Sequence, residues 1–229
     1  MELALLLHIF PEGVEELDGA FAVYADAPPM GFDVLEVHDA PDGWEERWRE
    51  FHRPVRIGPM WVGPPWLEPP ADAVPIVVDP GRAFGTGAHA TTRLCLELLV
   101  ALDRGSLLDV GCGSGVLAIA AAKLGYRPVH LLDADPVAVE VAAANARANG
   151  LELEPRLADA LVDPLPGVDV TVANLTFEAV EALGSRLASP LLVASGYSAR
   201  EEPAPAGFRR LERRVREGWA AEVFARETE

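Results

Sequence analysis

Short apolar runs alternate with helical apolar stripes along the chain from Val74 onward. The runs at 107–110, 129–132, 168–173 and 191–195 are mostly apolar, as in parallel strands that are buried on both faces. Between them, apolar residues recur at three- or four-residue intervals, which predicts amphipathic helices. Their stripes comprise Leu94, Leu98 and Leu102; Val116, Ala120 and Leu124; and Val137, Val141, Ala144 and Ala148. The alternation predicts the α/β class, with a Rossmann-like, doubly wound and mostly parallel sheet.

The other segments predict a small N-terminal α+β appendage and a closing pair of strands. Residues 3–10, 21–24 and 34–37 have strand character, and 14–17 is interpreted as a short helix. Residues 44–52 carry an apolar stripe typical of a helix, and six prolines between 54 and 70 indicate an extended connector. We therefore divide the chain into 1–43, 44–73 and 74–229.

Near the C-terminus, residues 208–225 predict two strands with Gly218 near their turn. Pro203 and Pro205 leave little room for a helix between the run at 191–195 and these strands, because proline disrupts a helix interior.

Charge and cysteine content narrow the function classes. With 36 acidic residues against 19 basic ones, the formal net charge is −17, which argues against a general nucleic-acid binder. The arginines between 209 and 216 are interpreted as a solvated face of paired strands. Cys95 and Cys112 form neither a disulfide framework nor a metal-ligand pattern, so no metal is expected. The apolar run at 3–7 is too short to span a membrane and lacks a signal peptide's basic flank, which predicts cytoplasmic location and no membrane partner.

A glycine-rich turn follows the predicted strand at 107–110 and opens directly into a helix. Gly111, Gly113 and Gly115 have the spacing Gly-x-Gly-x-Gly, which allows a tight turn and close approach of a ligand to the backbone. Asp109 lies just before this loop, at the strand end. The spacing differs from the Gly-x-Gly-x-x-Gly of dinucleotide-binding folds, although a glycine-rich turn alone would accommodate other nucleotides.

Later polar residues are candidates for the same ligand. Asp133 ends the next predicted strand, where its carboxylate could accept both hydroxyls of a ribose. The alternative role of helix cap suits Asp135 better, because Pro136 follows it at the first helical position. Asp159, after the third strand, is interpreted either as an acceptor for an adenine amino group or as a loop carboxylate. Asn174 closes the fourth strand, and the carboxyl ends of such strands share one ligand-binding crevice.

Together these motifs resemble those of the ribosomal protein L11 methyltransferase family, which are class I S-adenosylmethionine-dependent methyltransferases. The resemblance extends from about Trp44 to the C-terminus. It is carried by Phe84-Gly-Thr-Gly-x-His89-x-Thr-Thr92, Asp109-x-Gly-x-Gly-Ser-Gly-Val-Leu-Ala-Ile-Ala120, Asp133-x-Asp-Pro136 and Val172-Ala-Asn-Leu175. The first motif combined with Asn-Leu is highly specific, whereas the glycine loop is shared by all such methyltransferases.

The resemblance implies S-adenosyl-L-methionine as cofactor and trimethylation of N-terminal and lysine amino groups on ribosomal protein L11. It implies cofactor contacts at Thr92, Gly111, Asp133 and Asn174. The loop from Phe84 to Gly87, which includes Thr86, would lie over the cofactor and help form the transfer site. In two places the chain differs from the family: 1–43 is a truncated form of the N-terminal substrate-recognition region, and the last crossover helix has little room.

Methyl transfer from a sulfonium is an in-line displacement that needs a neutral amine, whereas a lysine with a pKa of about 10.4 is mostly protonated at neutral pH. A site can lower the amine pKa by desolvating it and can align its lone pair with carbonyl acceptors. We predict that the Asn174 side-chain oxygen and the Leu175 carbonyl accept the amine's hydrogens, so that no dedicated general base is required. Asn174 could alternatively be a strand-end turn residue. His89 is interpreted as a proton relay, as a residue that holds the loop, or as a polar residue at a helix start.

Three other functions stay open from the sequence. Methylation of another protein's lysine, or of a small amine, is the stronger alternative. A nucleic-acid methyltransferase is weaker, because the Asn/Asp-Pro-Pro-Tyr motif of enzymes that methylate bases or glutamine is absent. The third is an inactive cofactor-binding module, which the short N-terminal region favours and the intact residues from Phe84 to Thr92 disfavour.

Overall fold

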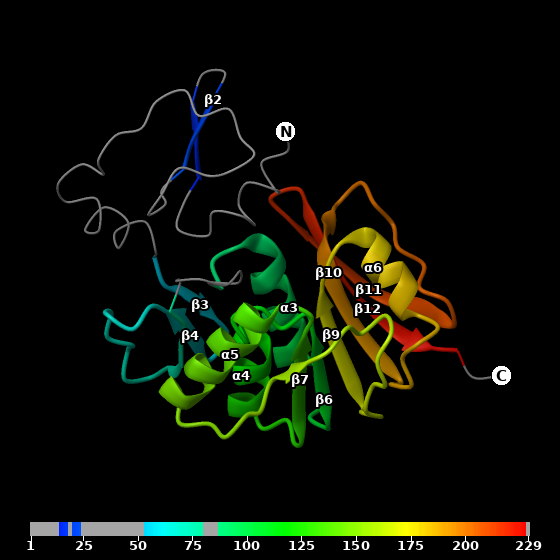
Figure 1. Ribbon diagram of the computed structural model, residues 1–229, viewed down its shortest axis with the longest axis horizontal. Helices are drawn as coiled ribbons and strands as arrows, with labels where there is room; N and C mark the ends of the chain where they lie inside the picture. The colour runs from blue at the N-terminus through cyan, green and yellow to red at the C-terminus, as the bar shows by residue number, and fades with distance from the viewer. Residues whose placement is uncertain (1–13, 18–19, 24–52, 80–86, 228–229) are drawn as a thin grey trace.

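The computed structural model describes residues 14–17, 20–23, 53–79 and 87–227 of the chain (Figure 1). A seven-stranded sheet forms its centre, in the order β11-β12-β10-β9-β6-β7-β8. Its strands are β6 (Leu107–Val110), β7 (Val129–Asp133), β8 (Arg156–Leu157), β9 (Val170–Asn174), β10 (Leu191–Ser198), β11 (Phe208–Arg216) and β12 (Trp219–Arg226). The pairings from β10 to β8 are parallel, and β12 is antiparallel to both neighbours. The predicted Rossmann-like, mostly parallel sheet is confirmed.

Helices cover both faces of this sheet, as a doubly wound fold requires (Figure 1). They are α3 (Ala90–Ala101), α4 (Val116–Leu124) and α5 (Pro136–Ala148) on one side, and α6 (Phe177–Leu183) on the other. Alternate residues of β6 belong to different apolar clusters: Leu107 to the cluster of Leu98 in α3, and Leu108 to that of Leu183 in α6. Burial on both faces explains why the strand sequences are continuous apolar runs.

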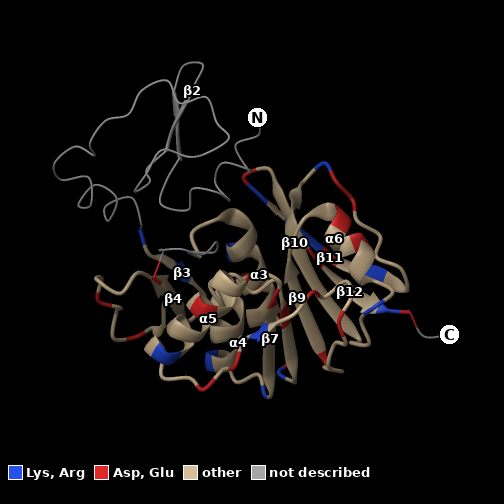
Figure 2. Cartoon of the chain, viewed as in Figure 1, with Lys and Arg blue, Asp and Glu red and all other residues tan. Residues whose placement is uncertain are grey.

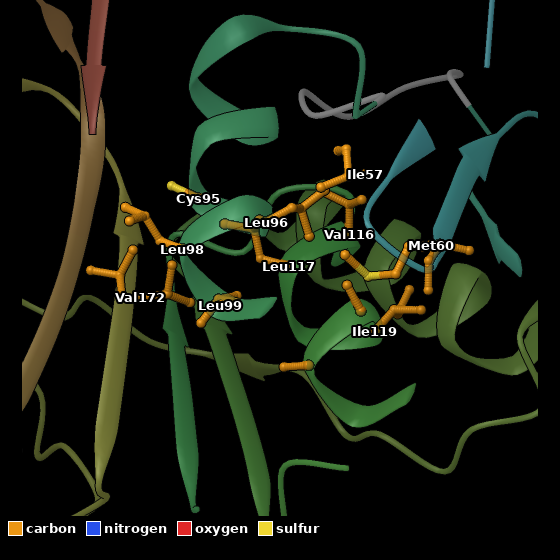
Figure 3. Close-up of a cluster of buried hydrophobic side chains, with 14 of the residues drawn as sticks. Ile57, Met60, Cys95, Leu96, Leu98, Leu99, Val116, Leu117, Ile119 and Val172 are labelled. Carbon is orange, nitrogen blue, oxygen red and sulfur yellow. The ribbon is translucent and has the colours of Figure 1, made fainter. Parts of the chain in front are cut away.

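A second sheet of three strands packs against the cluster of α3 and α4. It consists of β3 (Val55–Ile57), β4 (Met60–Gly63) and β5 (Val74–Val77), with β4 antiparallel to β3 and parallel to β5. Ile57 and Met60 from this sheet are buried with Val116 and Ile119 of α4 (Figure 3). The proline-rich segment, predicted as an extended connector, supplies two strands, and hydrogen-bonded turns from Pro64 to Leu67 and from Pro70 to Ala73 follow them. The pairing of β4 with β5 crosses the predicted boundary between 73 and 74, and the domain division stays a prediction.

Residues 14–17, predicted as a short helix, form a strand instead. β1 (Val14–Leu17) pairs antiparallel with β2 (Ala20–Val23), which overlaps the strand predicted at 21–24. The Asp-Gly dipeptide between them in the sequence is a strong hairpin signal, and it outweighs the weak helical pattern. The strands predicted at 3–10 and 34–37 and the helix predicted at 44–52 lie outside the described residues.

The buried face of α5 differs from the predicted stripe by one residue. Ala138, Ala142, Asn145 and Ala146 are buried, rather than the predicted Val137, Val141, Ala144 and Ala148. Two asparagines on this face bond to backbone groups of other elements. The Asn149 amide pairs with both backbone groups of Val77, accepting from its N–H at 2.9 Å and donating to its C=O at 2.6 Å. Polar contacts thus orient the helix, and an apolar periodicity cannot reveal them.

Asn145 ties α5 to the glycine loop and to the chain that follows β5. Its Nδ2 donates to the Ser114 carbonyl at 2.9 Å, and its Oδ1 accepts from the Asp79 N–H at 3.2 Å. Asn145 is only 4% exposed, so both contacts are shielded from water. The three elements are therefore held at fixed distances from one another.

The C-terminal region forms the predicted pair of strands, with Gly218 (φ 79°) in the turn. The described residues between β10 and β11 contain no helix, as Pro203 and Pro205 predicted. Arg210 and Arg213 of β11 contact the buried Glu222 at 2.9 and 2.6 Å, and Figure 2 shows basic and acidic residues side by side in this part of the sheet. None of the helices in the described ranges is both long and apolar enough to cross a membrane.

Candidate functional site

The register of the parallel strands brings three candidate residues to one edge of the sheet. The last ladder pairs join Val110 of β6 to its neighbours on both β7 and β9. The residues that follow on the three strands are Gly111, Asp133 and Asn174. They therefore meet at the carboxyl edge of the sheet, where open α/β sheets bind their ligands.

The glycine loop depends on backbone conformations that other residues rarely adopt. Gly111, Gly113 and Gly115 have φ values of 66°, 52° and 79°. Gly115 caps the start of α4, and a Cβ there would lie 3.1 Å from the Cβ of Ala142 in α5. The loop N–H groups and the helix start form a surface suited to an anionic or polar ligand.

Asp133 and Asp135 divide the two roles that the sequence suggested. The Asp135 carboxylate accepts from the Val137 N–H at 2.8 Å and caps α5. Asp133 accepts from the Gly113 N–H and from the Asp135 N–H, each at 2.9 Å and each at a different oxygen. A carboxylate oxygen has a further lone pair, so Asp133 keeps acceptor capacity beside the loop.

Asp109 is a buried carboxyl group below the loop, with only 1% of its surface exposed. Its Oδ2 accepts from the Ala118 N–H at 3.0 Å, whereas Oδ1 has no hydrogen-bond partner among the described residues. Burial raises the pKa of Asp109 to about 7; the bond from Ala118 opposes this rise, and the charge of Asp133 adds to it. A buried carboxyl oxygen without a partner is a candidate acceptor for a cationic ligand.

Asn174 contributes a second buried acceptor at this edge. Its Nδ2 donates to Thr92 Oγ1 of α3 at 3.4 Å, which joins two predicted site residues that lie 82 positions apart. Its Oδ1 is buried and has no partner among the described residues. Buried polar atoms without partners are uncommon in folded proteins, and each calls for an explanation. Two of them at a ligand-binding edge fit a ligand that donates hydrogen bonds.

Leu175 is held between two glycines. A Cβ on Gly111 would lie 2.5 Å from Leu175 Cδ2, and a Cβ on Gly196 of β10 would lie 2.1 Å from the Leu175 carbonyl oxygen. The Leu175 N–H also donates to the Ser195 carbonyl at 2.8 Å. The side chain of Leu175 therefore occupies space beside the glycine loop, while its peptide group lies against β10.

His89 lies at the start of α3 and contacts the C-terminal hairpin. Its ring accepts from the Thr91 N–H at 3.4 Å and pairs with Thr91 Oγ1 at 2.8 Å, so it is the N-cap of the helix. The ring also packs edge-on against Trp219, with 4.9 Å between centroids. Burial lowers the pKa of His89, and the charge of Glu217 opposes this. Of its three interpretations, the helix-start role is the one visible in these contacts.

Asp159 is the described site candidate that does not join this cluster. Asp159 is exposed, and its Oδ1 accepts from the Leu161 N–H at 2.8 Å, as a loop carboxylate would. Phe84 and Thr86 lie outside the described residues. A contact from Asp159 to adenine stays a prediction, as do the roles of the two loop residues.

Sequence reasoning missed Gly196 and Trp219. Gly196 interrupts an apolar strand, and an isolated glycine in a strand is a known signal for a bulge or a close backbone approach. The structure has both, since the register with β12 shifts between Ser195 and Tyr197. No sequence pattern linked Trp219 to His89, because 130 positions separate them.

The sheet with its reversed β12, and the glycine loop that meets carboxylates and an amide at its edge, define a class I methyltransferase. A crystal structure of a ribosomal protein L11 methylase from Lactobacillus delbrueckii subsp. bulgaricus has this fold, with 27% identity and a TM-score of 0.69 over 77% of this chain and 100% of that one. A putative RNA methyltransferase from Pyrococcus horikoshii shares the fold alone, at 18% identity and a TM-score of 0.51 over 64% of this chain and 87% of its own.

The chain belongs to the ribosomal protein L11 methyltransferase family, whose sequence model matches residues 25–199. A relative of that name from Methylococcus capsulatus is 40% identical over 81% of this chain and 68% of its own length. Another from Herpetosiphon aurantiacus is 39% identical over 84% and 72%, and one from Pelotomaculum thermopropionicum is 38% identical over 80% and 63%. The resemblance is confirmed. The match to the family begins at residue 25, earlier than the predicted start near Trp44, and it ends at residue 199, before β11.

Replacing Gly196 by alanine is expected to destabilise the fold more than the same change at Gly125. Both have positive φ, 104° and 101°, so an added side chain is strained at either position. A Cβ on Gly125 would meet no atom within 4 Å, whereas one on Gly196 would displace the Leu175 peptide. Urea denaturation of both variants measures the difference, and equal losses in free energy of unfolding would contradict close packing of Leu175 on β10.

Proposed function

We propose that this chain is an S-adenosylmethionine-dependent protein methyltransferase that acts on amino groups, lysine side chains or the N-terminus, of ribosomal protein L11. The observation that carries the proposal is a pair of buried oxygens, Asp109 Oδ1 and Asn174 Oδ1, that have no hydrogen-bond partner in the described part of a chain of this family. Relatives that bear the L11 methyltransferase name support the substrate. Because ribosomal proteins are synthesised in the cytoplasm, the proposal includes a cytoplasmic location.

The residues at the sheet edge fit S-adenosylmethionine chemically. When bound, this cofactor supplies a methyl group on a sulfonium, and it also carries an ammonium, a ribose and an adenine. Gly111, Gly113 and Gly115 would let the cofactor approach the protein backbone closely. Asp133 would accept hydrogen bonds from the ribose hydroxyls. Asp109 and Thr92 would lie near the end of the cofactor that carries the ammonium. Asp159 is the candidate for the adenine amino group.

The Asn174-Leu175 pair would prepare the substrate amine. Asn174 Oδ1 is an acceptor that no described protein group occupies, and the Leu175 carbonyl is a second candidate acceptor on the next residue. Shielding from water disfavours the ammonium form and so lowers the amine pKa, and the two acceptors align the lone pair of the neutral amine. No dedicated general base is then required. Phe84 and Thr86 would complete this site as the resemblance implies, and His89 would hold the start of α3.

Transfer of labelled methyl from S-adenosylmethionine to purified L11 of the same organism, with whole-cell extract in parallel, tests the proposal. Label on L11 is the expected result. Label on a different extract protein or on a small amine would replace the substrate. The chain spans about two thirds of the length of the relatives named above, so the substrate is open to such a correction. No label despite tight cofactor binding would favour an inactive module.

An Asn174→Ala variant is expected to lose roughly 10²-fold in kcat, the usual effect of removing one positioned hydrogen-bonding group. The matched control is Thr176→Ala, two residues along. Thr176 caps α6 by accepting from the Ala179 N–H at 3.4 Å, so its loss costs stability but leaves the Asn174 side chain in place. Single-turnover rates, with cofactor affinity measured separately, provide the comparison. An Asn174→Ala protein with full turnover and unchanged affinity would refute the acceptor role.

Cofactor affinity is expected to rise with pH until about pH 7 and then level off. Burial holds the pKa of Asp109 at about 7 in the free protein, and a bound cation favours the carboxylate and lowers that pKa. The free protein then binds more protons than the complex below pH 7, so binding releases a proton and affinity grows by up to about tenfold per pH unit in this window. Calorimetry in buffers of different ionisation enthalpy measures the released proton. Asp109→Asn should abolish the dependence, and an unchanged dependence would assign it to another group.

A further inference from the structure

The turn between β11 and β12 packs along the first two turns of α3. His89, Arg93 and Glu97 are spaced four residues apart, so they lie on one face of this helix. Each has a partner in the turn: the His89 ring lies 4.9 Å from that of Trp219, and Arg93 lies 3.8 Å from Glu217. Glu97 accepts from Arg216 at 2.7 Å, between side chains that are about 30% exposed. Figure 1 shows the tip of this hairpin beside the start of α3.

The same turn is attached to β10, which holds Leu175. The Ala199 N–H, directly after β10, donates to the Gly218 carbonyl at 2.8 Å. The turn therefore joins the two elements that flank Asn174 and Leu175, namely α3 and the end of β10. It does so from a part of the chain, 216–219, that lies beyond the residues matched by the family.

The backbone of this turn carries strain at Glu217. Glu217 is the described non-glycine residue with positive φ, at 52°, and Gly218 follows with φ 79°. Two positive φ values in a two-residue hairpin loop favour Asn or Asp at the first position, and glutamate is a poor choice there. Strain of this kind persists where the surroundings maintain it. Here the Glu217 carboxylate faces Arg93 and His89.

We propose that the turn at 216–219 positions the active site, with Trp219 and Arg216 as positioning residues that act through α3. The critical distance is the 3.4 Å between Asn174 Nδ2 and Thr92 Oγ1, which is at the limit of a hydrogen bond. Thr92 lies on α3 between His89 and Arg93, so a shift of the helix start moves its hydroxyl away from Asn174. The expected effect on kcat rests on the proposed methyltransferase function, whereas the effect of the turn on the position of α3 does not.

The test compares Trp219→Leu with Trp66→Leu, the replacement of another partly buried tryptophan, in the connection between β4 and β5. In the free protein, amide hydrogen exchange at 90–95 is expected to accelerate in Trp219→Leu and to remain unchanged in Trp66→Leu. In the methylation assay, kcat of Trp219→Leu should fall roughly tenfold, because small misplacements of positioning groups are costly. Trp219→Phe, which keeps an aromatic edge for His89, should restore both readouts.

A second pair of variants covers the case in which Trp219→Leu fails to fold. Arg216→Gln and Glu97→Gln, singly and together, remove the ion pair at the other end of the contact. Non-additive losses in kcat and in exchange protection would support the proposal. Unchanged exchange at 90–95 in all these variants, or accelerated exchange with full kcat, would overturn it. If the wild type methylates nothing, the proposed function fails, while the exchange data still decide whether the turn holds α3.

Discussion

Because β7, β6 and β9 end in register, a carboxylate, a glycine loop and an amide from three distant parts of the chain meet at one edge of the sheet. A slip of one residue in any strand would turn its side chains to the opposite face, since the side-chain period of a strand is two. Asp109 would then leave the face of α4, and Asn174 would lose Thr92. The register is maintained by burial on both sides, because alternate residues of these strands join different apolar clusters.

The site also requires that its backbone segments approach one another closely, which small residues allow. Gly115 allows α5 to approach the glycine loop, while Gly111 and Gly196 leave space for Leu175 on its two sides. At Gly196 the neighbouring atoms belong to the Leu175 backbone, which cannot rotate away as a flexible side chain would. Densely packed interiors transmit displacements, so a larger side chain at Gly196 would displace Leu175 and, through it, the glycine loop.

Buried polar groups complete what apolar packing leaves undetermined. Asn145 and Asn149 orient α5 against β5 and the loop. On the opposite side of the molecule, Glu222 is fully buried, and Arg210, Arg213 and Tyr197 surround it in the region where β10 leads to β11 without a helix. Burial and the charge of Glu222 both raise the pKa of the Tyr197 hydroxyl, which keeps it a hydrogen-bond donor.

The sequence by itself determined the elements whose cause is local. The strand at Leu107–Val110, the Asp135-Pro136 helix start and the turn at Gly218 were predictable, because apolar periodicity, capping and turn chemistry act over a few residues. The motifs also indicated Asp109, Asp133 and Asn174 as members of one site. Only the tertiary structure decided the orientation of α5, the contact of Trp219 with His89 and the fit of Leu175 against Gly196. Each of these depends on packing between residues far apart in the chain, and no local pattern records which distant groups will meet. The strand at Val14–Leu17 is a different case, because the Asp-Gly dipeptide before Ala20–Val23 is a local hairpin signal that the helix prediction left out.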